Sequence, residues 1–151
     1  MQQALADLAG IGSGVGAPGA LAKLAEGLQK VGRRDEALGA LELGVARAEQ
    51  QGQHYCDAEL YRLRAEILLD MDGNAVDEAE TLFNQSLEIA RRQEARTFEL
   101  RAATSLARLW QRQGKRDAAR ALLAPLYAWF TEGFDTRDLR NAKALLDELA
   151  S

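Results

Sequence analysis

Three arginines in the second half of the chain have the spacing of a single helix face. Arg101, Arg108 and Arg112 are separated by seven and four residues, and residues at such intervals point to the same side of an α-helix. A guanidinium group binds a carboxylate or a phosphate through paired hydrogen bonds. The spacing therefore predicts a basic stripe that either binds an anionic ligand or pairs with acids of the chain itself, such as Glu59 and Glu66.

Charge is divided unevenly along the chain, although its net value is only −4. Residues 57–88 hold nine acids and two arginines, whereas residues 91–120 hold nine bases and three acids. This division predicts either neighbouring elements that pair or a basic binding face. Nucleic-acid binding through residues 91–120 is the less favoured form of such a face, because aromatic side chains for base stacking are scarce.

Other motifs with chemical potential lack the context that their chemistry needs. Gly14–Gly19 has the letters of a dinucleotide-binding turn, but no strand pattern precedes it, so we expect a connector. Asp70–Asn74 resembles the start of a calcium loop, yet its glycine and its twelfth residue do not fit, which favours a polar turn. His54, Cys56 and Asp57 lack a second ligand cluster, so we expect a helix start and no metal site.

The chain is also poorly supplied for catalysis. It has one histidine, one cysteine and no serine-centred catalytic turn, so we expect no enzyme activity and no cofactor. A single cysteine requires no oxidising compartment, and neither a signal peptide nor an apolar run of about 18 residues is evident. We therefore expect a cytoplasmic protein that does not enter membranes.

Composition indicates which elements position these side chains. Leu and Ala account for 24 and 28 of the 151 residues, whereas Val, Ile and Thr together number only 12. This mixture favours helices and leaves little material for a buried sheet. The sequence therefore predicts an all-α protein.

Small residues recur at a fixed interval and indicate internal repeats. Ala37, Ala79 and Ala119 are 42 and 40 residues apart, and a second alanine series upstream has steps of 40 and 42 (Ala25, Ala65 and Ala107). Apolar residues spaced three and four apart surround both series, as in paired helices that approach closely at the small residues. We therefore expect three helical hairpins over about residues 20–51, 55–93 and 97–131.

These hairpins resemble the tetratricopeptide repeat, an α-α superhelix. The resemblance rests on small and aromatic positions of each unit, clearest in the second, although the period exceeds the family's 34 residues and the usual proline is missing (Tyr61, Ala65, Leu68, Ala79 and Phe83). A further resemblance covers roughly residues 20–149. The runs Asp57–Leu69, Ser86–Gln93 and Ala124–Thr136 look like the C-terminal repeat region of bacterial signalling ATPases linked to nucleotide cyclases.

The family resemblance implies a concave groove lined by the first helix of each unit. Carried over position by position, the groove residues are Glu26, Gln29, Lys30, Glu59, Arg62, Glu66, Arg101, Thr104, Arg108 and Arg112. The resemblance thus implies a non-catalytic interaction module that binds an acidic peptide or a neighbouring domain and regulates bacterial signalling. Since related ATPases detect inducers with helical repeats, a small-molecule sensor is the alternative.

The ends of the chain differ from the repeats. Residues 1–19 are expected to form a helix stub followed by a glycine-rich connector, and Leu5 and Leu8 of the stub could support homodimerisation. Residues 137–149 are expected to form a capping helix that ends the 20–149 repeat domain, since its leucines share one face. Asp35 is expected to cap the second helix of the first unit, and Pro125 should fall inside the second helix of the third.

Overall fold

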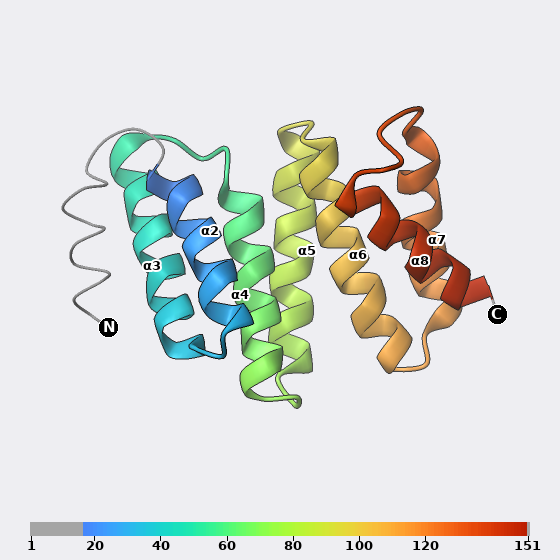
Figure 1. Ribbon diagram of the computed structural model, residues 1–151, viewed down its shortest axis with the longest axis horizontal. Helices are drawn as coiled ribbons and strands as arrows, with labels where there is room; N and C mark the ends of the chain where they lie inside the picture. The colour runs from blue at the N-terminus through green and yellow to red at the C-terminus, as the bar shows by residue number, and fades with distance from the viewer. Residues whose placement is uncertain (1–16, 151) are drawn as a thin grey trace.

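The computed structural model describes residues 17–150, which form helices without a strand (Figure 1). All-α architecture is therefore confirmed for this part of the chain. The seven described helices are α2 (Ala17–Lys30), α3 (Arg34–Gln51), α4 (Asp57–Met71), α5 (Val76–Arg92), α6 (Arg96–Arg112), α7 (Arg116–Trp129) and α8 (Arg137–Ala150). They make three hairpins, α2–α3, α4–α5 and α6–α7, followed by one further helix.

Glycine turns close the first and third hairpins in the same way. Gly32 and Gly114 have φ angles of 84° and 78°, a left-handed conformation that glycine adopts without steric cost. The residue after each glycine donates its backbone N–H to the carbonyl five residues earlier, at 2.8 Å in both turns (Arg33 to Leu28, Lys115 to Trp110). The aligned sequence segments therefore have the same hairpin geometry.

The repeated alanines occupy equivalent buried positions. Ala25, Ala65 and Ala107 lie in α2, α4 and α6, and each is 0% exposed. Ala37, Ala79 and Ala119 lie in α3, α5 and α7 and are equally buried. Small side chains at these positions let the helices of a hairpin pack closely, so the period of about 41 residues reflects the packing.

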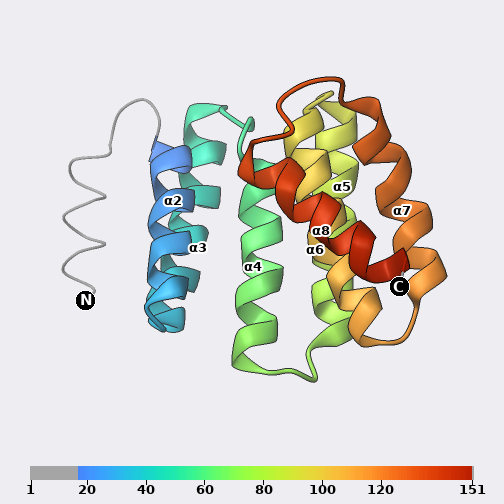
Figure 2. The same ribbon diagram turned by 45° about the vertical axis from the view of Figure 1, so that its right-hand side comes forward.

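The first helices of the units form one layer and the second helices form another. Helix α4 contacts α2, α6 contacts α4, and α8 contacts α6, whereas α3, α5 and α7 contact only helices of the first layer. Figure 2 shows α8 lying across α6 and beside α7. Since only the first layer is continuous, it forms the inner face of the superhelix.

The start of the first described helix differs from the sequence-based expectation. Helix α2 begins at Ala17, so the last three residues of the expected connector are helical; Pro18 fits the first helical turn, where its missing N–H has no partner to lose. The expected stub, with Leu5 and Leu8, lies outside the described residues.

Capping of α3 also differs from the expectation. Arg33 occupies the N-cap position without a side-chain cap hydrogen bond, and Asp35 lies in the first turn. Arg33 instead pairs with Glu36, with its Nε 2.6 Å from the carboxylate. Acidic side chains in the first turn, such as Asp35 and Glu36, stabilise the helix because they lie near the positive end of its dipole. Pro125 lies inside α7, as expected.

Candidate binding site on the inner face

A buried ion-pair network lies at the centre of the inner face. Glu59 and Arg62 of α4 are each 8% exposed, and they form a two-pronged pair with N–O distances of 2.8 and 3.1 Å. Arg62 also donates to Glu66 at 3.2 Å and to the Ser105 hydroxyl of α6 at 3.4 Å, and that hydroxyl donates to Glu66 at 2.8 Å. Each buried charge thus has partners, as burial in a low-dielectric interior requires.

Arg101 extends this network from α4 to α8. Its Nη1 lies 3.1 Å from Glu59, and its Nε lies 2.8 Å from Asp138 at the start of α8. One guanidinium group therefore joins the second hairpin to the final helix. For Arg101, the interpretation that the arginines pair with the chain's own acids agrees with the structure.

The network shifts the pKa values of Glu59, Arg62 and Arg101. Burial alone would raise the pKa of Glu59, but hydrogen bonds and positive charge from Arg62 and Arg101 outweigh it and lower that pKa. Burial alone would likewise lower the pKa of Arg62 and of Arg101, but their carboxylate partners raise both. Glu59, Arg62 and Arg101 are therefore charged at neutral pH.

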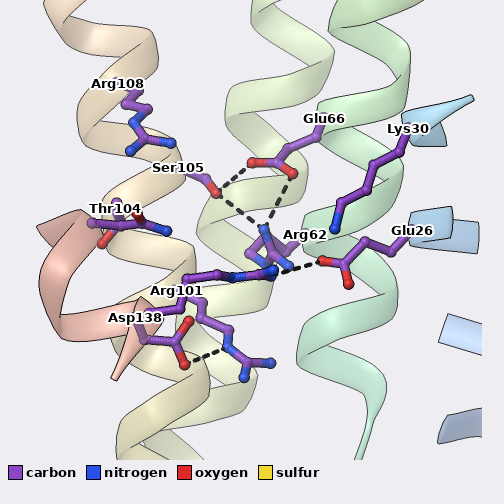
Figure 3. A pocket seen from close by; sticks show the side chains of 11 residues that line it. Glu26, Lys30, Arg62, Glu66, Arg101, Thr104, Ser105, Arg108 and Asp138 are labelled. Carbon is purple, nitrogen blue, oxygen red and sulfur yellow. Dashed lines mark hydrogen bonds and ion pairs between the residues drawn. The ribbon is translucent and has the colours of Figure 1, made fainter. Parts of the chain in front are cut away.

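A polar pocket opens beside this network, between α2, α4, α6 and α8 (Figure 3). Its volume is about 320 Å³, and its lining includes five bases and three acids (Glu26, Lys30, Arg62, Glu66, Arg101, Thr104, Ser105, Arg108, Arg137, Asp138 and Asn141). A second hollow of about 190 Å³ lies next to it and shares Glu66, Ser105 and Arg108 with it. Arg108 thus stands at the boundary of the two.

Three basic side chains near the pocket do not take part in the ion-pair network. Arg108, Arg112 and Lys30 are exposed, and no hydrogen bond or ion pair is found for their side chains within residues 17–150. Their positive charge faces the two hollows, since Arg108 and Lys30 line the first and Arg108 and Arg112 line the second. The predicted stripe therefore divides into Arg101, which the fold holds in ion pairs, and Arg108 and Arg112, whose side chains have no partner among residues 17–150.

The structure brings together all ten residues that the family resemblance implied. Seven of them line the first pocket, Gln29 and Arg112 line the second, and Glu59 lies in the buried network, paired with Arg62 and Arg101. Sequence reasoning missed Ser105, Arg137, Asp138 and Asn141. The last three belong to α8, which starts 41 residues after the start of α6. Helix α8 contacts α6 and α7 in the way that the first helix of a repeat unit contacts the preceding unit. The repeat period was therefore the signal that could have identified these three residues.

The remaining sequence motifs have local roles. Asp72 accepts the backbone N–H of Asn74 at 2.9 Å, as expected of a polar turn. His54 contacts Asp57 at 2.9 Å, and Cys56 is buried at the start of α4. Gly19 lies within α2. Among residues 17–150, no group of three histidine, cysteine or acidic side chains is arranged to hold a metal ion.

Comparisons with family models, with curated proteins and with solved structures give no match to this chain. None of the described helices has the length and apolar character needed to cross a bilayer. The fold and the pocket together define the chain as an α-helical repeat stack with a charged inner face.

Proposed function

We propose that this chain is a non-catalytic interaction module that binds an acidic protein segment, or a neighbouring domain, along its inner face. The observation that carries the proposal is a pair of exposed arginines, Arg108 and Arg112, which have no side-chain partner in the part of the chain that the structure describes and lie beside a pocket built from four helices. The resemblance to tetratricopeptide repeats and to the repeat region of bacterial signalling ATPases supports the same function. A regulatory role in the bacterial cytoplasm follows from that resemblance.

The proposed binding depends on a difference between two kinds of arginine, those in ion pairs of the fold and those exposed without one. Arg101 and Arg62 are engaged by buried acids, so they hold the helices in place. Arg108 and Arg112 are exposed and have no ion pair with any described residue, so a carboxylate can reach them without first breaking such a pair. Because these arginines are exposed, we expect the binding to weaken as salt is added.

A charge-reversal experiment tests this proposal. The variant R108E/R112E is compared with R92E/R120E, which reverses two exposed arginines on the second helices α5 and α7. Binding of a fluorescent oligoglutamate peptide is followed by anisotropy at low salt. We expect about a tenfold or greater loss in R108E/R112E, because hydrogen bonds to charged groups contribute about 1.5 kcal/mol or more each. The control should bind like the wild type.

Two outcomes contradict the proposal. One is equal binding of the acidic peptide by the two double variants, which would place the contact elsewhere or make it non-specific. The other is equally tight binding of an oligolysine peptide by the wild type, which would remove the role of positive charge. Circular dichroism of each variant establishes that the helical fold is retained.

A small-molecule sensor is the second candidate, and the pocket volume favours it. About 320 Å³ falls at the lower end of the range for small-molecule sites. A ligand present at 100 times its dissociation constant adds about 2.7 kcal/mol to the free energy of unfolding. A thermal-shift screen of anionic metabolites at millimolar concentration therefore tests this candidate, and the absence of any stabilising compound counts against it.

Nucleic-acid binding has less support from the arrangement of the basic segment. Arg91 and Arg96 contact Glu99, Arg101 contacts Glu59 and Asp138, and the bases of residues 91–120 are distributed over both helix layers. Retention on heparin that falls steeply as salt is added would support nucleic-acid binding. Homodimerisation through Leu5 and Leu8 remains a prediction, and light scattering at high concentration tests it.

A further inference from the structure

One ion pair spans the mouth of the pocket and joins the two ends of the described chain. Arg137 of α8 lies 3.5 Å from Glu26 of α2, although the backbones of these two helices are not in contact. Figure 3 shows Glu26 reaching into the pocket from the α2 side, opposite Arg101 and Asp138. Both side chains remain partly in water, with 64% of Arg137 and 33% of Glu26 exposed.

The three acids of the pocket differ in how firmly they are held. Glu66 accepts hydrogen bonds from Arg62 and Ser105, and Asp138 accepts one from Arg101 at 2.8 Å. Glu26 has one ion pair, with the exposed Arg137, and a longer-range attraction to Arg62. Since exposed pairs contribute about 0–1 kcal/mol, Glu26 is the acid that an incoming anion displaces most easily.

We propose that Glu26 acts as an internal competitor, occupying Arg137 until a ligand carboxylate replaces it. This inference rests on the proposed function and identifies a contact that regulates it. The entering carboxylate takes the place of the Glu26 carboxylate at Arg137, while Arg108 and Lys30 face the same pocket as additional cations. The α2–α8 bridge opens as the ligand binds.

The ligand class follows from the group that it replaces. A carboxylate has the same charge and planar shape as the Glu26 side-chain group, so it can form with Arg137 the ion pair that Glu26 forms in the structure. The carboxylate has two sources, an acidic side chain of a protein segment or a free dicarboxylate.

The test compares E26Q with E49Q, which removes an exposed acid from α3 away from the pocket. Both variants lose one negative charge, so a difference between them reports on position. Binding of oligoglutamate is measured by anisotropy, and binding of glutarate by calorimetry. We expect E26Q to bind about threefold to fivefold more tightly than E49Q, the range available from an exposed ion pair. R137Q should bind more weakly than the wild type.

The outcomes separate this inference from the proposed function. If R108E/R112E loses peptide binding while E26Q and E49Q bind alike, inner-face binding stands and the competitor role is overturned. Binding to R137Q at wild-type strength, or no binding of either probe to E26Q, overturns it as well. Tighter binding of the peptide alone identifies a protein segment as the source of the carboxylate, and tighter binding of glutarate alone identifies a free dicarboxylate.

Discussion

At the scale of single residues, Glu59 is the side chain on which the inner face depends. Its carboxylate holds Arg62 within α4 and Arg101 across from α6, and Arg101 in turn holds Asp138 of α8. A buried ion pair gains little over a well-packed apolar pair, but loss of one partner leaves an uncompensated charge. The network is therefore sensitive to single substitutions.

Glu59→Gln is expected to lower the free energy of unfolding by about 3 kcal/mol, the lower end of the range for breaking a buried pair. Arg62 keeps Glu66 in this variant, which limits the loss. Urea denaturation measures the change. Glu49→Gln, an exposed acid of α3, is the matched control and should change the free energy by less than about 0.5 kcal/mol.

The same residue predicts a pH dependence. The pKa of Glu59 is lower in the folded state than its ordinary value of 4.5, so its charged form stabilises the fold. That stabilisation is complete above pH 4.5 and is lost as pH falls through the folded pKa. Denaturation midpoints measured from pH 7 down to pH 2 should therefore fall more steeply in the wild type than in Glu59→Gln. Parallel curves would contradict this role.

How far the sequence predicts the site is visible in these residues. The spacing of Glu59, Arg62 and Glu66 places them on one helix face, and the repeat period brings Arg101 near them. The spacing left two interpretations of the arginines open, because an ion pair between helices depends on their distance and rotation. The structure decides for Arg101 and leaves Arg108 and Arg112 free within the described residues.

At the scale of helices, small residues determine how closely the two layers approach. Gly44 of α3 faces α4, and a methyl group added there would lie 3.0 Å from Leu60 Cδ2. Gly27 of α2 has nothing within 4 Å of the same added group. Close packing against Leu60 therefore explains the glycine at position 44, whereas the structure shows no packing reason for the glycine at position 27.

Gly44→Val is expected to destabilise the fold by about 1–3 kcal/mol, because its branched side chain forces Leu60 out of a buried position. Gly27→Ala should stabilise it by about 0.4–1 kcal/mol, since alanine restricts the unfolded chain without a clash. Thermal and urea denaturation measure both changes. A neutral Gly44→Val would mean that α3 and α4 can separate at little cost.

Helix positions were predictable because the local signals agree. Glycine turns, alanine series and leucine faces all repeat with one period, so element bounds within residues 20–149 lie within a few residues of the expected ones. The start of α2 was missed because a Gly-Ala-Pro-Gly segment reads as a connector, whereas Pro18 is buried in the first turn. Burial of that proline comes from packing that no local pattern reports.

At the scale of the whole molecule, the buried core has two parts that meet at α4. Leucines and alanines of α2 and α3 pack with Leu60, Leu63 and Ile67 of α4 in one cluster. The second cluster runs from Ala65 of α4 through α5, α6 and α7 to α8. Each helix contacts only near neighbours, so stability in such a stack is a sum of local terms.

This division of the core predicts that a substitution in one cluster destabilises mainly the helices that form that cluster. Leu41→Ala empties a position in the α2–α4 cluster and Leu123→Ala empties one in the α4–α8 cluster, and both leucines are buried. Each should cost about 2–5 kcal/mol. Native-state hydrogen exchange should show protection lost mainly in α2 and α3 for Leu41→Ala, and mainly in α6–α8 for Leu123→Ala.

The two variants serve as controls for each other, since both remove the same side-chain atoms. If either one lowers protection equally in all seven described helices, the stack unfolds as a single cooperative unit. In that case α4, which belongs to both apolar clusters, transmits the loss of packing from one cluster to the other. Repeating the exchange measurement with Leu41→Ala combined with Glu26→Gln then tests whether the Glu26–Arg137 ion pair, which joins α2 to α8, contributes to that coupling.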